Sequence, residues 1–355
     1  MSKGTVFITG ATGFLGSVFL LEALAKGYSA HVVARSESKA QIVKELVANH
    51  GYSNEPVEGK PYCKYFIVPD LTVPGALDEG VRGTTTVLHC ASPLPFAEIP
   101  ADRQQAEMID PAVACTLNML ESVRGAGGAT VRRVVVLASL IAFASADVMG
   151  PAWVPAEGTE ARPSEDTLND YITPPFPNLL VAYCAAKTAA LRSSLDWMRS
   201  QNTAEKPLGF DLVNLAPSYV QFDAAGPPEG PGLDPQGPLC VGGAVHMDDL
   251  AAICLEALDR DGKAKTPTSG DSKGVSNFCI SVDVVWDEAR KLAAAKWSKH
   301  VESGLLPNQG VFPTKPRIFF ASTKTEETFG MKLKGLEEMM DAIVPQYVEL
   351  LQKEK

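Results

Sequence analysis

Three glycines, each three residues after the last, constrain the fold of this chain more than any other feature. Gly10, Gly13 and Gly16 follow an apolar run at residues 5–8 and open a run of helical spacing at residues 17–25. In such a unit the first glycine permits a tight turn, the second lets the backbone approach a pyrophosphate, and the third lets helix and strand pack closely. The helix start then attracts phosphate. The pattern predicts a dinucleotide-binding turn, and the alternative is a glycine-rich turn without a ligand. We expect Thr12, Phe14 and Leu15 of the same turn to line the dinucleotide as well.

The first 140 residues alternate between short strand-like runs and runs of helical spacing. The strand-like runs are at 5–8, 30–34, 63–68, 86–90 and 133–139, and the helical ones at 17–25, 39–50 and 111–125. Such alternation predicts a parallel sheet with helices on both faces. The expected fold class is therefore α/β, a Rossmann-type doubly wound parallel sheet.

The second part of the chain is less regular. Residues 144–178 are rich in Pro, Gly and acidic side chains, and 226–243 are dominated by Gly and Pro. Long segments of this kind are loops, and they are uncommon in a compact domain unless they are functional. We predict a dinucleotide-binding Rossmann core over 1–220, with an excursion at 144–178. A smaller substrate-binding lobe follows over 221–355, with 245–260 returning to the core.

Composition and charge exclude several classes of protein. Apolar residues make up 45% of the chain and charged residues 21%, which excludes a wholly disordered chain. The net charge of −10 repels phosphate backbones, so we expect no nucleic-acid partner. No apolar run is long enough to cross a membrane or to form a signal peptide, which predicts a cytoplasmic protein without a membrane partner.

The seven cysteines and five histidines are scattered along the chain. The cysteines form no Cys-x-x-Cys pair and their number is odd, which is typical of reduced thiols rather than of a disulfide framework. The histidines show no zinc-type spacing. We expect no metal site, and a monomer or a homodimer.

The end of the second predicted strand bears on the choice of dinucleotide. An NAD enzyme usually has a carboxylate there for the ribose hydroxyls, whereas an arginine accommodates a 2′-phosphate. Here Arg35 occupies that place and Lys39 follows one helical turn later. Both cations suit a phosphate, which favours NADP(H) over NAD. Glu37 leaves open a solvated face of alternating charges.

Two further segments fit the same nucleotide cleft. Asp70 and Leu71 close the third strand, where a carboxylate and a backbone amide could reach an adenine. Ala91, Ser92 and Pro93 close the fourth strand at the carboxyl edge, where open α/β sheets bind ligands. Each segment alone could equally be an ordinary turn.

Tyr183 and Lys187 form a candidate catalytic pair. They lie four residues apart in a helical run, so the phenol and the ammonium share one face. A tyrosine with its ordinary pKa of about 10 is a poor acid at neutral pH, but a neighbouring ammonium stabilises the phenolate and lowers that pKa. The tyrosine can then protonate a carbonyl oxygen as hydride reaches the carbon. The alternative is an exposed helix face.

These motifs give the chain a resemblance to the extended (atypical) short-chain dehydrogenases/reductases over nearly its whole length. It most resembles the group of dihydroflavonol reductase, cinnamoyl-CoA reductase and yeast carbonyl (methylglyoxal) reductase. The matching segments are Thr9–Gly16, Val33–Lys39, Asp70-Leu71, Val87–Pro93, 110–113, Tyr183–Lys187, Asn214–Val220 and Val245–Ala251.

The resemblance implies an activity and roles for individual residues. The implied activity is NADPH-dependent reduction of a ketone or aldehyde, a small-molecule carbonyl substrate, to an alcohol. Tyr183 would be the catalytic acid, and Lys187 would bind the ribose and tune the tyrosine. Pro217 and Val220 would line the nicotinamide.

The chain departs from its family at the third catalytic residue, which is usually a serine. An ungapped match places Leu140 at that serine and Ser139 one residue early. Adjacent strand residues face opposite sides, so the offset matters. Either the strand end shifts and Ser139 acts, or Ser145 substitutes, or no serine acts. We favour Ser139.

A second departure follows Val220, where the family commonly continues with Gly-Pro after one residue, whereas this chain continues with Gln221, Phe222 and Asp223. We expect Leu94, Phe96 and Phe222 to contribute to the substrate pocket, which favours an apolar or aromatic carbonyl compound.

Two other functions stay open. A nucleotide-sugar epimerase or dehydratase shares the fold, the tyrosine and the lysine. Such enzymes typically use NAD, whereas Arg35 favours NADP, so Arg35 is evidence against this function. A repurposed non-redox or NADP-sensing protein on the same scaffold is the alternative that Leu140 supports.

Overall fold

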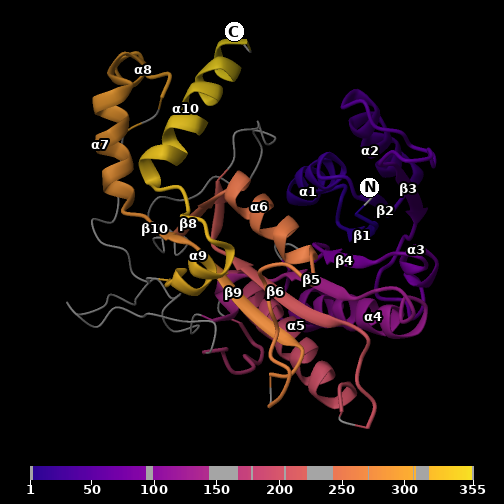
Figure 1. Cartoon of the computed structure of the whole chain (residues 1–355). Coiled ribbons are helices and arrows are strands. Elements are labelled where there is room, and N and C mark those ends of the chain that lie inside the picture. Colours follow the sequence, from indigo (N-terminus) through magenta and orange to yellow (C-terminus); the bar gives the residue numbers. More distant parts are fainter. Residues whose placement is uncertain are drawn as a thin grey trace. The chain divides into compact units, whose positions relative to one another are not determined.

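The computed structural model describes most of the chain and divides it into two compact units (Figure 1). The described residues are 3–92, 99–143, 167–176, 179–203, 205–221, 243–270, 272–306, 308 and 320–353. The first unit comprises Met1–Ala138, Asp170–Leu215 and Ala251–Phe278, and the second comprises Ser139–Asn169, Ala216–Leu250 and Cys279–Lys355. The assignment of a cofactor core and a substrate lobe to particular residue ranges stays a prediction.

A seven-stranded sheet organises the first unit, in the order β3-β2-β1-β4-β5-β6-β9. Its strands are β1 (Thr5–Thr9), β2 (Ser29–Ala34), β3 (Cys63–Ile67), β4 (Thr86–His89), β5 (Arg133–Leu137), β6 (Asp211–Pro217) and β9 (Val275–Ile280). The pairs from β3 through to β6 are parallel. Strand order reverses between β1 and β4, and such a reversal marks the carboxyl edge where open α/β sheets bind ligands. The predicted fold class is confirmed.

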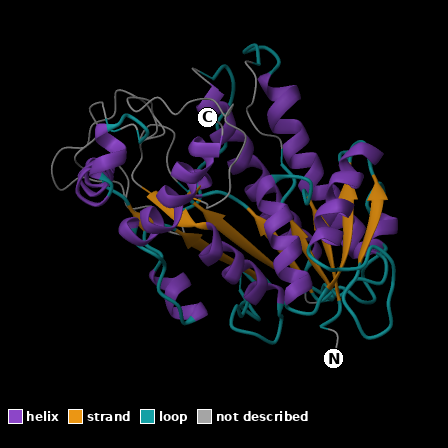
Figure 2. Cartoon of the chain, turned by 90° about the horizontal axis from the view of Figure 1, so that it is seen from above, coloured by secondary structure: helices purple, strands orange, loops and turns teal. Residues whose placement is uncertain are grey.

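Helices cover both faces of this sheet. They are α1 (Phe14–Ala25), α2 (Glu37–Asn49), α3 (Asp78–Val81), α4 (Asp110–Gly125), α5 (Leu179–Gln201) and α6 (Met247–Leu258). Figure 1 shows α1 and α2 on one face and α4 and α5 on the other, and Figure 2 shows helices packed along the strands. No described helix is both long enough and apolar enough to cross a membrane.

The core between the sheet and α4 is built from residues of one sheet row and one helix stripe. Phe7, Val87, Val134 and Leu212 are successive partners across β1, β4, β5 and β6, and each is fully buried. They pack with Met119 of α4 in one hydrophobic cluster. The period-two pattern of the strands and the helical spacing of α4 therefore bury the same apolar layer.

The second unit contains a small sheet and four helices among its described residues. The sheet order is β10-β8-β7, formed by β7 (Tyr219–Gln221), β8 (Gly243–His246) and β10 (Val282–Asp283). The helices are α7 (Trp286–Lys296), α8 (Ser298–Glu302), α9 (Thr323–Phe329) and α10 (Leu336–Lys353). Ala244, Val284 and Met339 form its small core.

Candidate active site

The glycine turn is shaped by two close backbone approaches. Gly10 has a φ of 78°, and a Cβ there would lie 2.8 Å from the Ala91 nitrogen. A Cβ on Gly16 would lie 2.3 Å from the Gly10 oxygen. No side chain caps α1 at Gly13, so the positive end of the helix dipole faces the turn. These features fit a dinucleotide pyrophosphate, which needs close approach to bare backbone.

Thr9 joins this turn to the end of β4. Its backbone carbonyl accepts from Cys90 at 3.2 Å, and its hydroxyl oxygen accepts from the Ala91 amide at 3.2 Å. The structure therefore brings the glycine turn and the predicted segment Ala91-Ser92 together. Pro93, Leu94 and Phe96 lie outside the described residues.

Arg35 follows the last residue of β2 and is exposed. The next residue, Ser36, caps α2 by accepting the Lys39 amide at 3.3 Å, which fixes the start of that helix beside Arg35. Arg35 and Lys39 therefore flank one capped helix start, as a phosphate site on the adenosine side requires.

Asp70 and Arg35 both act on the buried Cys115 of α4. Burial, and after it the Asp70 carboxylate, raise the pKa of the Cys115 thiol to about 11, and Arg35 opposes the rise. Asp70 accepts from the Thr72 amide at 2.8 Å and the Thr72 hydroxyl at 2.7 Å, which lowers the pKa of Asp70. Leu71 packs on the core cluster of α4. The sequence-predicted residues Arg35 and Asp70 therefore both lie within electrostatic reach of Cys115.

Tyr183 and Lys187 lie one turn apart on α5, with the Lys187 Nζ 5.7 Å from the centre of the Tyr183 ring. Burial lowers the pKa of Lys187 to about 8. The ammonium also acts on two residues at the carboxyl end of β4: it lowers the pKa of His89 and opposes the rise in the pKa of Cys90. Lys187 therefore stands at the edge of the sheet where the glycine turn ends.

His89 is a residue of this region to which the sequence pattern gave no role. It is 2% exposed, and its Nδ1 lies 2.8 Å from the Thr9 hydroxyl. Burial first, and then the charge of Lys187, lower its pKa to about 4, so the ring is neutral at physiological pH. A signal for it exists in the sequence, since Thr9 directly follows the strand expected at 5–8 and His89 lies next to the last residue of the strand expected at 86–90.

Ser139 and Leu140 follow the end of β5 at Leu137. Ser139 is half-buried, has extended backbone with φ −155° and ψ 146°, and precedes a 3₁₀ turn over Leu140–Ala142. Leu140 is 2% exposed, so its side chain is buried. Both residues belong to the second unit. Ser145 lies outside the described residues, and the choice among the serines stays a prediction.

The other expected residues are spread over the second unit. Pro217 is the last residue of β6, and Val220 pairs with Val245 between β7 and β8. Phe222 lies outside the described residues. Their roles toward the nicotinamide and the substrate stay predictions.

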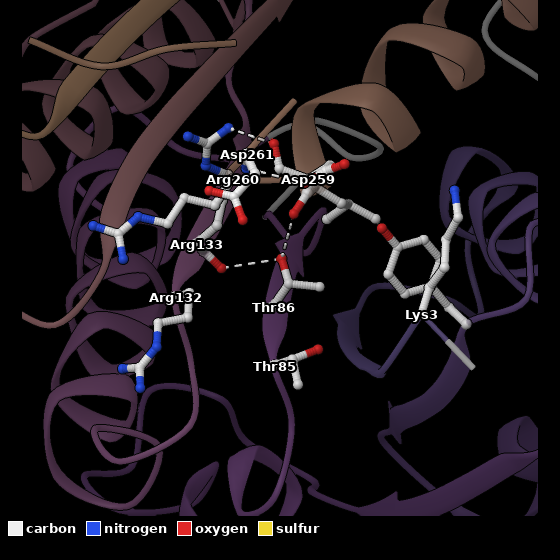
Figure 3. Close-up of a pocket in the computed structure, with 10 residues that line it drawn as sticks. Lys3, Thr85, Thr86, Arg132, Arg133, Asp259, Arg260 and Asp261 are labelled. Carbon is white, nitrogen blue, oxygen red and sulfur yellow. Dashed lines mark hydrogen bonds between the residues drawn. The ribbon is translucent and has the colours of Figure 1, made fainter. Parts of the chain in front are cut away.

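A cavity of about 370 Å³ lies at the opposite, amino edge of the sheet (Figure 3). Its buried Arg133 donates to both carboxylate oxygens of Asp211, at 2.7 and 2.8 Å, and to the carbonyls of Ala257 and Asp259. Thr86 donates to the carbonyls of Arg133 and Leu258 at 3.1 and 3.4 Å. These groups hold the strand starts together, and the nucleotide features lie at the other edge.

Comparison with known proteins gives consistent relatives over the whole chain. The ketoreductase CTB6 of Cercospora nicotianae is 30% identical over 100% of this chain and 98% of the relative. The NAD-dependent epimerase/dehydratase ALT6 of Alternaria alternata is 30% identical over 94% of this chain and 95% of its own. Among solved structures, Gre2 of Candida albicans superposes with a TM-score of 0.73 at 21% identity, covering 97% of this chain and 98% of that one.

The family profile described as "NAD dependent epimerase/dehydratase family" matches residues 6–215. This range contains the glycine turn, Arg35, the end of β4 and the pair Tyr183 and Lys187. Since it spans more than half of the chain and includes every nucleotide feature of the first unit, the chain belongs to the NAD dependent epimerase/dehydratase family, the extended short-chain dehydrogenases/reductases.

Proposed function

We propose that this protein is an NADP(H)-dependent carbonyl reductase that converts a ketone or aldehyde to an alcohol. The observation that carries the proposal is the position of Lys187. It is half-buried, acts on the pKa values of His89 and Cys90 at the end of β4, lies 5.7 Å from the Tyr183 ring, and belongs to the same compact unit as the glycine turn. A tyrosine beside a half-buried ammonium is suited to proton transfer next to a bound dinucleotide.

The cofactor is NADP(H). Arg35 and Lys39 at the start of α2 suit a 2′-phosphate, and no carboxylate stands at the end of β2 for a ribose diol. The relative in Candida albicans that is named a putative NADPH-dependent methylglyoxal reductase is 30% identical over 62% of this chain. Yeast Gre2, solved in complex with NADPH, shares the fold with a TM-score of 0.72.

The chemistry divides between the bound dinucleotide and the chain. When bound, the dinucleotide would supply hydride from its nicotinamide to the carbonyl carbon. Tyr183 donates its phenolic proton to the carbonyl oxygen, and the Lys187 ammonium stabilises the phenolate that remains. With a pKa of about 8, Lys187 is mostly charged at neutral pH and releases its proton readily.

We assign the substrate to the apolar or aromatic carbonyl compounds. Support comes from the apolar side chains Leu94, Phe96 and Phe222 in segments next to the cofactor motifs, and from relatives named ketoreductases. Pockets lined by such side chains favour ligands of matching character.

The test is NADPH oxidation by purified protein with a panel of apolar and aromatic ketones and aldehydes. Tyr183→Phe should lower turnover by about 100-fold or more and leave NADPH affinity unchanged, since it removes a proton donor and almost no volume. Tyr62→Phe, immediately before the start of β3, is the matched control and should keep full activity. Activity retained in Tyr183→Phe would assign the proton to another group, and inactivity of the wild type on the whole panel would reject the reductase.

A further inference from the structure

A row of three polar side chains and one valine crosses the sheet just inside its carboxyl edge. Thr9 pairs with His89, His89 with Val136, and Val136 with Asn214. Residues in one row of a parallel sheet project to the same face, so all four point toward the face that carries α4 and α5. Asn214 extends the row to β9, where its Nδ2 donates to the Asn277 Oδ1 at 2.9 Å.

The hydrogen bond between Thr9 and His89, at one end of this row, fixes the tautomer of His89. The Thr9 hydroxyl oxygen accepts from Ala91 at 3.2 Å and lies 2.8 Å from the His89 Nδ1. If Thr9 donates to Nδ1, the hydroxyl proton is used and the ring carries its own proton on Nε2. If Nδ1 were protonated instead, the buried hydroxyl proton and the Nε2 lone pair would both lack partners. The first arrangement leaves fewer buried groups unsatisfied.

At the other end of the row, the Asn214 Oδ1 is an acceptor without a donor among the described residues. Because Asn214 uses its Nδ2 toward Asn277, its Oδ1 is the free end of the carboxamide. The His89 Nε2 and the Asn214 Oδ1 are both buried without a hydrogen-bond partner among the described residues. Their strands are two spacings apart, about 9.6 Å at the backbone, which is too far for direct contact and suits one or two water molecules. In the row, the apolar Val136 of β5 lies between them.

A third unsatisfied group comes from α5. The Thr188 hydroxyl, next to Lys187 in the chain, is fully buried and has no partner within the described part of the chain. The same helix contributes Trp197 and Met198 to the cluster that contains Val136, so α5 covers this face of the sheet. Buried waters typically make about three hydrogen bonds to groups of this kind.

We infer that ordered water bridges the His89 Nε2, the Asn214 Oδ1 and the Thr188 hydroxyl, and so completes one hydrogen-bonded chain from Ala91 to Asn277. Every bond in it runs in one direction, from the Ala91 amide through Thr9, His89, water and Asn214. Bonds aligned in this way polarise and strengthen one another. His89 is thus a positioning residue.

The chain has two consequences for the site. It fixes the Ala91 backbone, which borders Gly10, and it places a neutral ring beside Lys187. A carboxylate there would pair with the ammonium and hold its proton, whereas the neutral imidazole leaves that proton available. This catalytic consequence rests on the role proposed for Lys187, while the tautomer and the water do not.

Nitrogen NMR of ¹⁵N-histidine-labelled protein tests the tautomer, with His31 as an internal control. The His31 Nδ1 lies 2.8 Å from the Gly80 carbonyl, which can only accept, so that ring must carry its proton on Nδ1. We expect the opposite at His89, with Nε2 protonated and Nδ1 bare at neutral pH. Protonation of Nδ1 in both rings, or a charged His89, would overturn the inference, whatever the outcome at Tyr183.

The water bridge is tested by removing its other ends. Asn214→Leu and Thr188→Val should each shift the His89 Nε2 resonance and leave that of His31 unchanged. A His89 resonance indifferent to both changes would remove the bridge from the inference. A crystal structure of the wild type at high resolution should show water between Nε2 and Oδ1, and direct apolar packing there would refute it independently of either variant folding.

Two substitutions distinguish the kinetic effect of the hydrogen bond at the His89 Nδ1 from that of the hydrogen bond at its Nε2. His89→Gln can place an N–H near the position of Nε2, whereas His89→Asn can place an oxygen near Nδ1 and face Thr9 only. If the hydrogen bond from the His89 Nε2 to water supports Lys187, His89→Gln should have a higher kcat than His89→Asn. His89→Asn, which keeps the contact with Thr9, should have the lower KM for NADPH. Equal losses in both parameters for both variants would indicate a merely structural histidine.

Discussion

The Lys187 ammonium lies 5.7 Å from the centre of the Tyr183 ring, one turn along the same helix. This spacing depends only on α5, so the pair is set by the sequence of one helix and not by the packing of distant segments. The position of the pair in the unit depends on tertiary structure, because α5 presents Lys187 to the end of β4, where it acts on His89 and Cys90.

The first prediction concerns the 2′-phosphate. Arg35→Asp should weaken NADPH binding by roughly ten- to a hundredfold, the scale of a charge-assisted contact, and should spare NADH. Titration of each cofactor by fluorescence measures this. Arg132→Asp, an exposed arginine at the amino edge, is the control and should bind both cofactors as the wild type does. Equal losses for both cofactors in Arg35→Asp would show that Arg35 does not contact the phosphate.

The second prediction is a pH dependence set by Lys187. Burial disfavours its charged form and lowers its pKa from 10.5 to about 8, so the ammonium is lost as pH rises through about 8. Carbonyl reduction that needs the ammonium should therefore fall in kcat above about pH 8. Lys187→Arg, which keeps its charge, should move that fall to higher pH even if the variant is slower. An inflection unchanged in Lys187→Arg would assign it to another group.

The same shift links Lys187 to folding. Between about pH 8 and 10.5 the unfolded chain still binds the proton that the folded chain has released. The contribution of Lys187 to the free energy of unfolding must then rise with pH across that window. Comparing wild type with Lys187→Met by urea denaturation at several pH values measures this, and a difference that does not vary with pH would contradict it.

The third prediction tests the glycine turn. A Cβ on Gly16 would lie 2.3 Å from the Gly10 oxygen, a backbone atom, so Gly16→Ala must displace the turn or the helix. NADPH binding should weaken by more than about tenfold, because the pyrophosphate contacts depend on that backbone. Gly125→Ala has no atom within 4 Å of the added methyl group and should bind normally. Normal binding by Gly16→Ala would place the pyrophosphate elsewhere.

The fourth prediction concerns the ion pair at the amino edge. Arg133 and Asp211 have side chains 1% and 7% exposed, so removing one partner leaves an uncompensated buried charge. Arg133→Met should lower the free energy of unfolding by about 3–5 kcal/mol. The neighbouring Arg132→Met, at an exposed side chain, should change it by about 0.5 kcal/mol or less. Urea denaturation compares them, and similar effects of the two substitutions would mean that Asp211 finds sufficient partners without Arg133.

Short-range patterns account for the parts of the site that the sequence predicts. The glycine turn, the Arg35–Lys39 helix start and the pair on α5 each lie within one or two elements, where spacing alone fixes geometry. The pair of Thr9 with His89 and the pair of Arg133 with Asp211 each join strands about 80 residues apart. Such contacts depend on strand register. The period-two alternation of a strand shows which face of the sheet a side chain is on, but not which residue of the neighbouring strand it lies beside.

The end of β5 shows the same limit at its sharpest. The β-branched run predicts a strand to residue 139, but β5 ends at Leu137 and a 3₁₀ turn begins after Ser139. A run of apolar residues continues through that turn because Leu140 and Ile141 are themselves buried. Hydrophobicity therefore marks burial here and gives no sign of where the backbone leaves the sheet.

The fifth prediction concerns the missing family serine. Leu140 is 2% exposed, so its side chain is buried, whereas Ser139 is half-buried and its hydroxyl makes no cap to the following turn. If Ser139 donates to the substrate oxygen, Ser139→Ala should lower kcat by about 10²-fold, as loss of one oxyanion donor does, without changing NADPH affinity. Ser145→Ala, the matched serine, should change little.

Leu140→Ser gives the decisive comparison for that serine. It removes a buried side chain, so it should cost about 2–5 kcal/mol of unfolding free energy, measured by urea denaturation. Introduced into Ser139→Ala, it should not restore carbonyl reduction, because residues 139 and 140 differ in exposure and the new hydroxyl would be buried where the leucine was. A silent Ser139→Ala together with faster reduction by Leu140→Ser would reverse the assignment. The native chain would then be a reductase that has lost its serine, and a non-redox role on the same scaffold would become the better account.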